Sequence, residues 1–166
     1  ALPISLVITI FQKRLAFVFI QFKNAIRILL IFIFSTASIF SDDSIDKKNI
    51  EESIDKYFAT WSNADMEGYE SCFHPNAMIH FERNGDVRSE NLSTFIEGQK
   101  NAHQYAMEKM KEVPLSKKIQ LDKNAAQVIV RWKLTTNSRE QYGYDYFTLI
   151  KYKKKWKIIY LIFNND

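Results

Sequence analysis

The chain has 166 residues, 46% of them hydrophobic and 25% charged, which is enough for one domain with a core but short for two. Four glycines and three prolines exclude a collagen-like or broadly disordered chain, and a single cysteine excludes a disulfide scaffold. The net charge of +4 comes from residues 1–41, which carry basic residues but no acidic ones, so the remainder is electrically balanced. A domain without net positive charge is not expected to bind nucleic acid.

Residues 1–41 are typical of an export signal. The basic stretch Lys23–Arg27 precedes a short apolar run and the small residues that end at Ala37. We expect cleavage after Ala37 or near Ser41, which makes residues 42–166 a single exported domain, periplasmic or secreted and bacterial in style.

The signal layout opens near Lys23, so residues 1–22 are interpreted either as an upstream extension or as the result of a misplaced start. Basic residues interrupt the earlier apolar stretches before they reach the ~20 residues that a membrane helix needs. No stable membrane span is therefore expected after signal cleavage. The alternative is an uncleaved membrane anchor.

The first part of the exported domain has helical periodicity. Asn49, followed by Glu52, predicts a helix start, and Asp65 predicts the cap of a second, shorter helix that ends before Pro75. A third helix is expected from about Ser93 to Met110. The apolar residues at helical spacing in the first helix are Ile50, Ile54, Tyr57, Phe58 and Trp61.

Two kinds of sequence pattern predict the strands. Asn84-Gly85 predicts a tight hairpin between strands over residues 77–82 and 86–89. After Pro114 the period changes to two, and short polar links separate the segments as antiparallel neighbours. The four strands expected there are Lys117–Leu121, Ala125–Thr136, Gln141–Tyr152 and Lys155–Phe163. On the last strand we expect Trp156, Ile158, Tyr160 and Ile162 to face the helices.

Three phrases carry a family resemblance: Tyr57-Phe58-Ala59-Thr60-Trp61, Phe73-His74-Pro75-Asn76-Ala77, and Asp145–Lys151 followed by Trp156-Lys157-Ile158. With the order of elements, they make the chain similar to the nuclear-transport-factor-2-like superfamily, in its SnoaL-like and lumazine-binding branch. The resemblance implies an α+β, cone-shaped fold with three N-terminal helices packed on a strongly curved antiparallel sheet. One departure is Lys153-Lys154-Lys155, where members often have an Asp-Gly turn.

The resemblance also implies a cavity between sheet and helices, with Asp145 facing inward on the parity of Gly143 and Phe147. A desolvated carboxyl there would have a raised pKa, suited to an acid or base, while the alternative is a satisfied structural carboxylate. Tyr160 is the second catalytic candidate, and its alternative is a core tyrosine. The expected ligand-binding walls are Tyr57, Trp61, Phe81, Trp132 and Phe147.

No pattern of ligating side chains has metal spacing, and the glycines are isolated, so neither a metal nor a cofactor is expected. Lysines 151–157 around one turn are interpreted as a solvated, edge-protecting cluster, with an anion-binding patch as the alternative. The opposite parity of the neighbouring strand is rich in tyrosine, which predicts a homodimer through the outer face of the sheet. The tyrosines on this face are Tyr142, Tyr144, Tyr146 and Tyr152.

Three functions are consistent with these patterns. The first is an exported domain that binds an apolar or aromatic small molecule in the cone, without an assured catalytic set. The second is a cyclase- or isomerase-type enzyme with Asp145 as the acid or base and Tyr160 orienting the substrate. The third is a protein-interaction module whose cone is filled by its own side chains.

Overall fold

The computed structural model describes residues 23, 43–83 and 85–166. The chain divides into two compact units, Ala1–Ser44 and Ile45–Asp166, and the fold described below is that of the second. The predicted signal over residues 1–41 lies outside the described residues except for Lys23. Within the described ranges, no helix is both long and apolar enough to cross a bilayer.

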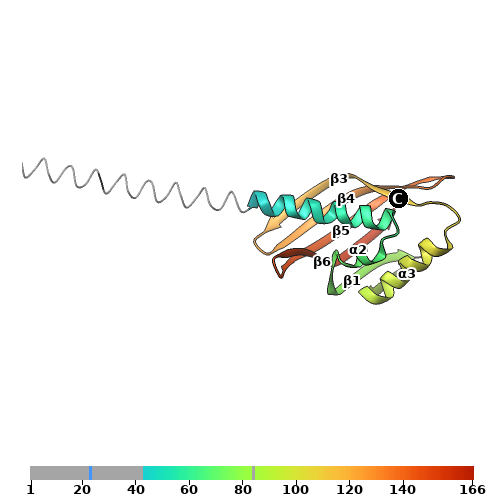
Figure 1. The fold of residues 1–166 in the computed structure, drawn as a ribbon, viewed down its shortest axis with the longest axis horizontal. Coiled ribbons are helices and arrows are strands. Elements are labelled where there is room, and N and C mark those ends of the chain that lie inside the picture. Colours follow the sequence, from blue (N-terminus) through green and yellow to red (C-terminus); the bar gives the residue numbers. More distant parts are fainter. Residues whose placement is uncertain (1–22, 24–42, 84) are drawn as a thin grey trace, which may run out of the picture. The chain divides into compact units, whose positions relative to one another are not determined.

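One sheet of six strands, in the order β2-β1-β6-β5-β4-β3, forms the framework (Figure 1). Neighbouring strands pair antiparallel, except that β1 and β6 run parallel. The strands are β1 (Phe73–Arg83), β2 (Asp86–Asn91), β3 (Lys111–Asp122), β4 (Ala125–Thr135), β5 (Glu140–Tyr152) and β6 (Lys155–Asn165).

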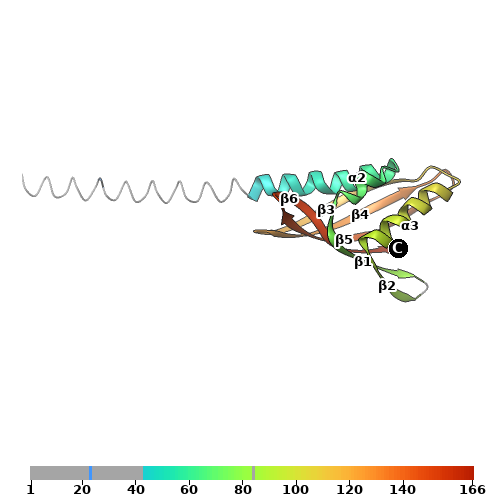
Figure 2. The ribbon, with the colours of Figure 1, turned by 60° about the horizontal axis from the view of Figure 1, so that its bottom comes forward.

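Three helices pack against this sheet (Figures 1 and 2). The unit is helical from its first residue to residue 62, and the shorter helices are α2 (Met66–Glu70) and α3 (Leu92–Tyr105). The predicted α+β fold with helices on a curved, mainly antiparallel sheet is confirmed, with the parallel β1–β6 pair as the exception.

The helix over residues 45–62 begins before Asn49, so the predicted start is wrong by at least four residues. Its predicted apolar face is confirmed, because all five of its large apolar residues are buried. The earlier start has a visible anchor: the buried Asp46 carboxylate accepts hydrogen bonds from Trp156 Nε1 at 3.1 Å and Lys151 Nζ at 2.8 Å. The helix is thereby fixed to the β5–β6 hairpin.

The predicted cap of α2 is confirmed, since the Asp65 carboxylate accepts a hydrogen bond from Gly68 N at 2.8 Å. Helix α3 is shorter than predicted. It begins after the Asn91 cap and ends at Tyr105, because Ala106 is extended (φ −65°, ψ 124°). Residues 106–110 therefore form a loop before β3.

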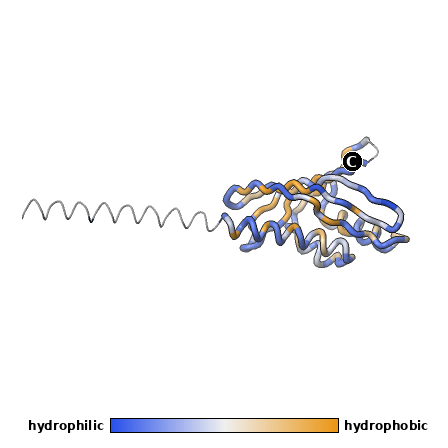
Figure 3. The backbone as a smooth tube through the Cα atoms, turned by 90° about the horizontal axis from the view of Figure 1, so that it is seen from above, coloured by the Kyte–Doolittle hydropathy of each residue, from blue (hydrophilic) through white to orange (hydrophobic). Residues whose placement is uncertain are grey.

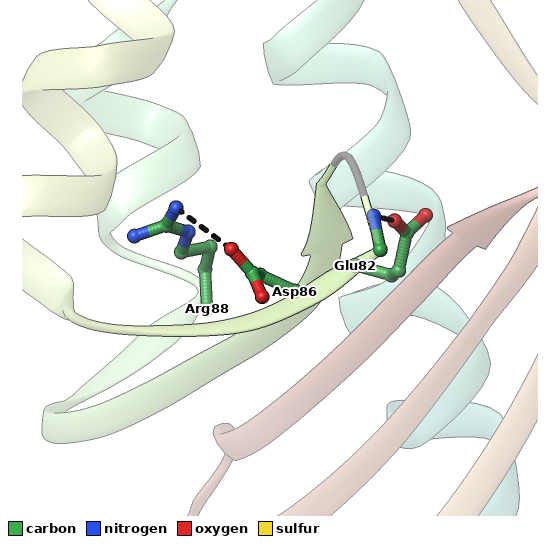
Figure 4. Close-up of polar contacts among 4 residues, drawn as sticks. Glu82, Asp86 and Arg88 are labelled. Atoms are coloured by element: carbon green, nitrogen blue, oxygen red, sulfur yellow. Dashed lines mark hydrogen bonds and ion pairs between the residues drawn. The ribbon is translucent and has the colours of Figure 1, made fainter.

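The β1–β2 hairpin closes where the dipeptide predicts it, with Arg83 paired to Asp86 and Gly85 at φ 84°. Figure 4 shows two contacts around this turn: Gly85 N donates to the Glu82 carboxylate, and Arg88 Nη2 lies 3.4 Å from Asp86 Oδ2. Glycine is required here because the backbone is in the left-handed region.

Strand β3 starts six residues before the predicted strand and contains Pro114. The proline is tolerated because β3 is an edge strand and its pairing with β4 shifts between Pro114 and Ser116. Apolar and polar positions alternate along the strands (Figure 3), and four even-numbered apolar residues of β4 face the core. Those residues are Ala126, Val128, Val130 and Trp132, all at most 4% exposed.

Candidate functional site

Asp145 lies on the inner face of the sheet, as predicted. Its side chain is 2% exposed, and the neighbours on its parity in β5, Gly143 and Phe147, are buried as well. Tyr57 of the first helix packs its ring edge to face with Phe147, with the ring centroids 5.0 Å apart. The structure therefore brings a carboxyl from the sheet and an aromatic side chain from a helix together in the core.

The polar atoms at this point are incompletely paired. Asp145 Oδ2 and Trp132 Nε1 are both buried, and neither makes a hydrogen bond of normal geometry among the described residues. Burial raises the pKa of Asp145 to about 7, although weak hydrogen bonding from the Trp132 and Tyr57 side chains acts to lower it. Buried polar atoms that lack well-formed hydrogen bonds are costly in an aromatic interior, which is unusual for a purely structural site.

A second carboxyl, Glu112 of β3, belongs to the same site and was missed by the sequence reasoning. Burial raises its pKa well above the ordinary value, and the nearby Asp145 carboxylate acts in the same direction. Its backbone is fixed to the first helix, because Ser62 Oγ donates to Glu112 O at 2.8 Å and accepts from Glu112 N at 2.9 Å. The Asp145 carboxylate therefore opposes the ionisation of Glu112, and both carboxyls hold their protons to higher pH than isolated ones do.

Two tyrosines complete the inner wall. The rings of Tyr57 and Tyr69 have centroids 4.8 Å apart, and both side chains are buried. Burial raises the pKa of each hydroxyl well above its ordinary value, and the carboxyl of Asp145 contributes in the same direction. Both phenols are therefore neutral hydrogen-bonding groups at physiological pH.

Trp61 lies at the end of the first helix, where its Nε1 donates to Gln99 Oε1 at 2.8 Å. The His103 ring meets the Trp61 ring edge to face, with centroids 4.6 Å apart. His103 Nε2 is buried without a hydrogen-bond partner among the described residues, and burial lowers the pKa of this histidine. Trp61 is thus buried at the end of the first helix with a neutral histidine beside it, and its role in a ligand-binding wall stays a prediction.

Tyr160 does not belong to this site. Its side chain is 48% exposed on the outer face, so the prediction that it faces the interior is wrong. The cause is a bulge in β6: Leu149 pairs with Ile158 and Thr148 with Tyr160, which leaves one extra residue between them. The extra residue reverses the parity of the strand, so that Leu161 is buried in place of Tyr160.

Phe81 faces inward, as expected, and is partly buried against the core. It stacks on Phe163 of β6 with centroids 5.0 Å apart and an interplanar angle of 15°. The two rings border an apolar hollow of about 440 Å³ near the β1–β2 hairpin. Phe81 is therefore placed at a different part of the sheet from the Asp145 carboxyl.

Two hollows lie at the loop over residues 106–110. One of about 450 Å³ reaches the β4–β5 turn, and one of about 350 Å³ is lined by His103. Both are lined by Met110, two residues before Glu112. Asp145 lines neither of them, so its carboxyl is closed off from both.

A family comparison agrees with this geometry. Residues 45–164 match the family described as "Putative lumazine-binding". The chain belongs to this family. No curated protein matches the sequence.

Solved structures place the domain in the nuclear-transport-factor-2-like fold. Rv3472, a protein of unknown function from Mycobacterium tuberculosis, is 19% identical with a TM-score of 0.65, over 76% of this chain and 75% of that one. A protein of this fold from Shewanella baltica, of unknown function, is 18% identical with a TM-score of 0.58, over 74% and 95%.

A protein described as "Putative Scytalone Dehydratase", from Novosphingobium aromaticivorans, is 12% identical with a TM-score of 0.63, over 75% of this chain and 86% of that one. At these identities the likeness concerns the fold alone. The predicted superfamily, in its SnoaL-like and lumazine-binding branch, is confirmed.

Proposed function

We propose that this domain binds a small aromatic or apolar molecule at the Asp145 carboxyl, in the interior of the cone. The observation that carries the proposal is a pair of buried polar atoms without well-formed hydrogen bonds, Asp145 Oδ2 and Trp132 Nε1. A ligand that offers a donor to the first and an acceptor to the second removes the cost of leaving both unpaired.

The surroundings favour a flat, weakly polar ring system. Tyr57, Trp132 and Phe147 supply aromatic surface around the carboxyl, and the raised pKa of Asp145 lets it donate or accept a proton near neutral pH. A fused heterocycle with neighbouring N–H and C=O groups, such as the lumazine ring that the family description names, satisfies these requirements.

The loop over residues 106–110 is the proposed entrance. It is held to the β4–β5 turn by Glu108 Oε2, which accepts hydrogen bonds from Ser138 N and Ser138 Oγ, each at 3.1 Å. Both hollows described above border this loop, and Met107 projects fully into solvent. Opening the Glu108–Ser138 contact exposes the path toward Glu112 and Asp145.

Native mass spectrometry of the full chain, purified from its source and then mixed with lumazine, tests the proposal. We expect either a co-purified small molecule that lumazine displaces or binding of the added lumazine itself. The Trp132→Phe variant should bind lumazine more weakly. Unchanged binding by that variant, or a protein that carries and accepts no ring compound, contradicts the proposal. The second result supports an interaction module filled by its own side chains.

The enzyme alternative is favoured by one specific observation, the effect of the Asp145 carboxylate on the pKa of the nearby Glu112. Two neighbouring carboxyls with raised pKa values suit acid–base chemistry on a bound ring. Asp145→Asn keeps an oxygen acceptor at this position but no ionisable proton, so it is expected to retain ligand binding in either case. If the protein is an enzyme, the same variant also loses turnover of the identified ligand.

We also propose that two copies of the chain associate through the outer sheet face. Apolar side chains are exposed there on adjacent strands: Ile129 by 38%, Tyr146 by 40% and Ile162 by 51%. Arg131 lies over the Tyr144 ring, 5.0 Å from its centroid. Sedimentation velocity should show a dimer that Ile162→Asp dissociates; a monomer before substitution contradicts the proposal.

Export is a separate proposal that rests on the sequence. Residues 1–41 have the layout of a signal, and the intact mass of the protein recovered from the periplasm or medium is expected to show cleavage after Ala37 or near Ser41. Recovery of uncleaved protein from the membrane fraction supports the anchor alternative instead.

A further inference from the structure

A lysine-lined hollow lies apart from Asp145 and Glu112, where the first helix, the end of α2 and the β5–β6 turn meet. Its volume is about 460 Å³. Four lysines line it, against one carboxylate, Glu52. The lysines are Lys56, Lys154, Lys155 and Lys157.

Two of these ammonium groups converge on one residue. Lys56 Nζ donates to Ser71 Oγ at 2.7 Å, and Lys157 Nζ donates to the backbone oxygen of the same serine. Burial lowers the pKa of Lys157, the thiol of Cys72 acts to raise it, and Lys56 and Lys155 lower it further. The positive charges of these lysines therefore repel one another, and the other residues that line the hollow do not fully offset this repulsion.

The turn that supplies Lys154 is strained. Lys153 and Lys154 have φ values of 48° and 64°, in the left-handed region that asparagine and glycine favour in two-residue hairpin turns. Non-glycine residues held in this region concentrate at functional sites, where the surrounding structure fixes them. The lysines at this turn are thus not explained by turn geometry.

We propose that this hollow binds a phosphate group. Phosphate offers several strong acceptor oxygens and up to two negative charges, and lysine ammonium groups bind it as point charges, assisted here by the Ser71 hydroxyl. The hollow is larger than a phosphate ion, so it leaves room for part of the molecule that carries the group. That molecule is either a soluble phosphate ester or an anionic lipid headgroup, which share this chemistry.

Calorimetric titration of the full chain with inorganic phosphate and glycerol phosphate, at constant ionic strength, is the first arm of the test. The second arm measures co-sedimentation with phosphatidylglycerol vesicles against phosphatidylcholine vesicles. The Lys56→Gln/Lys157→Gln variant is expected to weaken binding by about tenfold per lysine removed. The matched control, Lys100→Gln/Lys118→Gln, removes the same charge from exposed positions outside the hollow and should change binding less than about twofold.

A gain-of-binding variant guards against loss of folding. Glu52→Gln removes the single carboxylate from the lining and is expected to tighten phosphate binding about threefold. Binding of the soluble phosphates that depends on Lys56 and Lys157 supports the proposal with a soluble ester as the source. Binding of phosphatidylglycerol vesicles alone, with the same dependence, supports it with a lipid as the source. Absence of both, or equal weakening by the control variant, overturns it.

Discussion

Trp132 and Gly143 are paired across β4 and β5, and the indole occupies the space where a side chain at residue 143 would lie. A Cβ atom built on Gly143 would be 2.3 Å from Trp132 Cζ2 and 2.1 Å from Asn164 O. The glycine therefore allows the indole to lie against the sheet. Gly143 is two positions from Asp145 on the same face of β5. The unpaired indole N–H of the candidate site depends on this arrangement.

Gly143→Ala is expected to destabilise the fold by about 3 kcal/mol, because a backbone oxygen and a packed ring must both move. Gly98→Ala is the matched control. Nothing lies within 4 Å of a Cβ atom there, and alanine favours a helix, so this variant should be stabilised by about 0.5–1 kcal/mol. Urea denaturation of both variants checks the pair, and equal losses would contradict the close approach at residue 143.

The pH dependence of stability should reveal Asp145. Its pKa is raised from 3.8 to about 7 in the fold, so between these values the unfolded chain has released a proton that the folded chain retains. Stability therefore falls as pH rises from about 4 to 7, by at most roughly 4 kcal/mol from this group, and the loss is complete above pH 7.

Asp145→Asn removes the carboxyl that retains this proton, so the variant should lose less stability than the wild type between pH 4 and 7. Glu112 keeps part of the slope, because its own pKa is raised well above the ordinary value. The exposed Asp122→Asn variant is the control. Chemical denaturation at several pH values gives the slopes, and parallel curves for wild type and Asp145→Asn would argue against a buried, protonated carboxyl.

Much of this arrangement follows from local sequence rules. The inward parity of Asp145 follows from the period of two along β5, because that strand is regular over its pairing with β4. The same rule fails on β6, where the extra residue after Ile158 turns Tyr160 outward, and nothing in the alternation of apolar residues indicates the bulge.

Glu112 was missed for a related reason. Pro114 was interpreted as the boundary after a long helix, whereas an edge strand accommodates a proline and extends back to Lys111. A carboxyl two residues before a proline carries no local signal of burial. Its proximity to Asp145 is a tertiary effect, produced by the pairing of β3 with β4 and by the contact with Ser62.

The anchor between Asp46 and the β5–β6 hairpin makes a third prediction. Asp46→Ala leaves the Trp156 indole N–H buried without its partner and removes the carboxylate from Lys151, which should cost about 2–3 kcal/mol. The hydrogen bond from Lys151 lowers the pKa of Asp46, so this stabilisation is present above the unfolded pKa and is lost as pH falls through the folded one.

Thermal denaturation of Asp46→Ala beside the exposed Asp43→Ala measures this contribution. The loss should be confined to Asp46→Ala and should shrink in acid, opposite in sign to the effect of Asp145. A loss of equal size at pH 3 and pH 7 would show that the helix is fixed by packing of apolar residues instead.

The strained β5–β6 turn makes the last prediction. Replacing Lys153 by Asn and Lys154 by Gly gives the turn residues that accept positive φ, which should raise the free energy of unfolding by about 1 kcal/mol. The same double variant removes Lys154 from the lysine-lined hollow and should weaken phosphate binding. Lys155→Gln, in the same lining but without positive φ, is the control: it should weaken binding without stabilising the fold. A double variant that is no more stable than the wild type would show that the two lysines carry little strain.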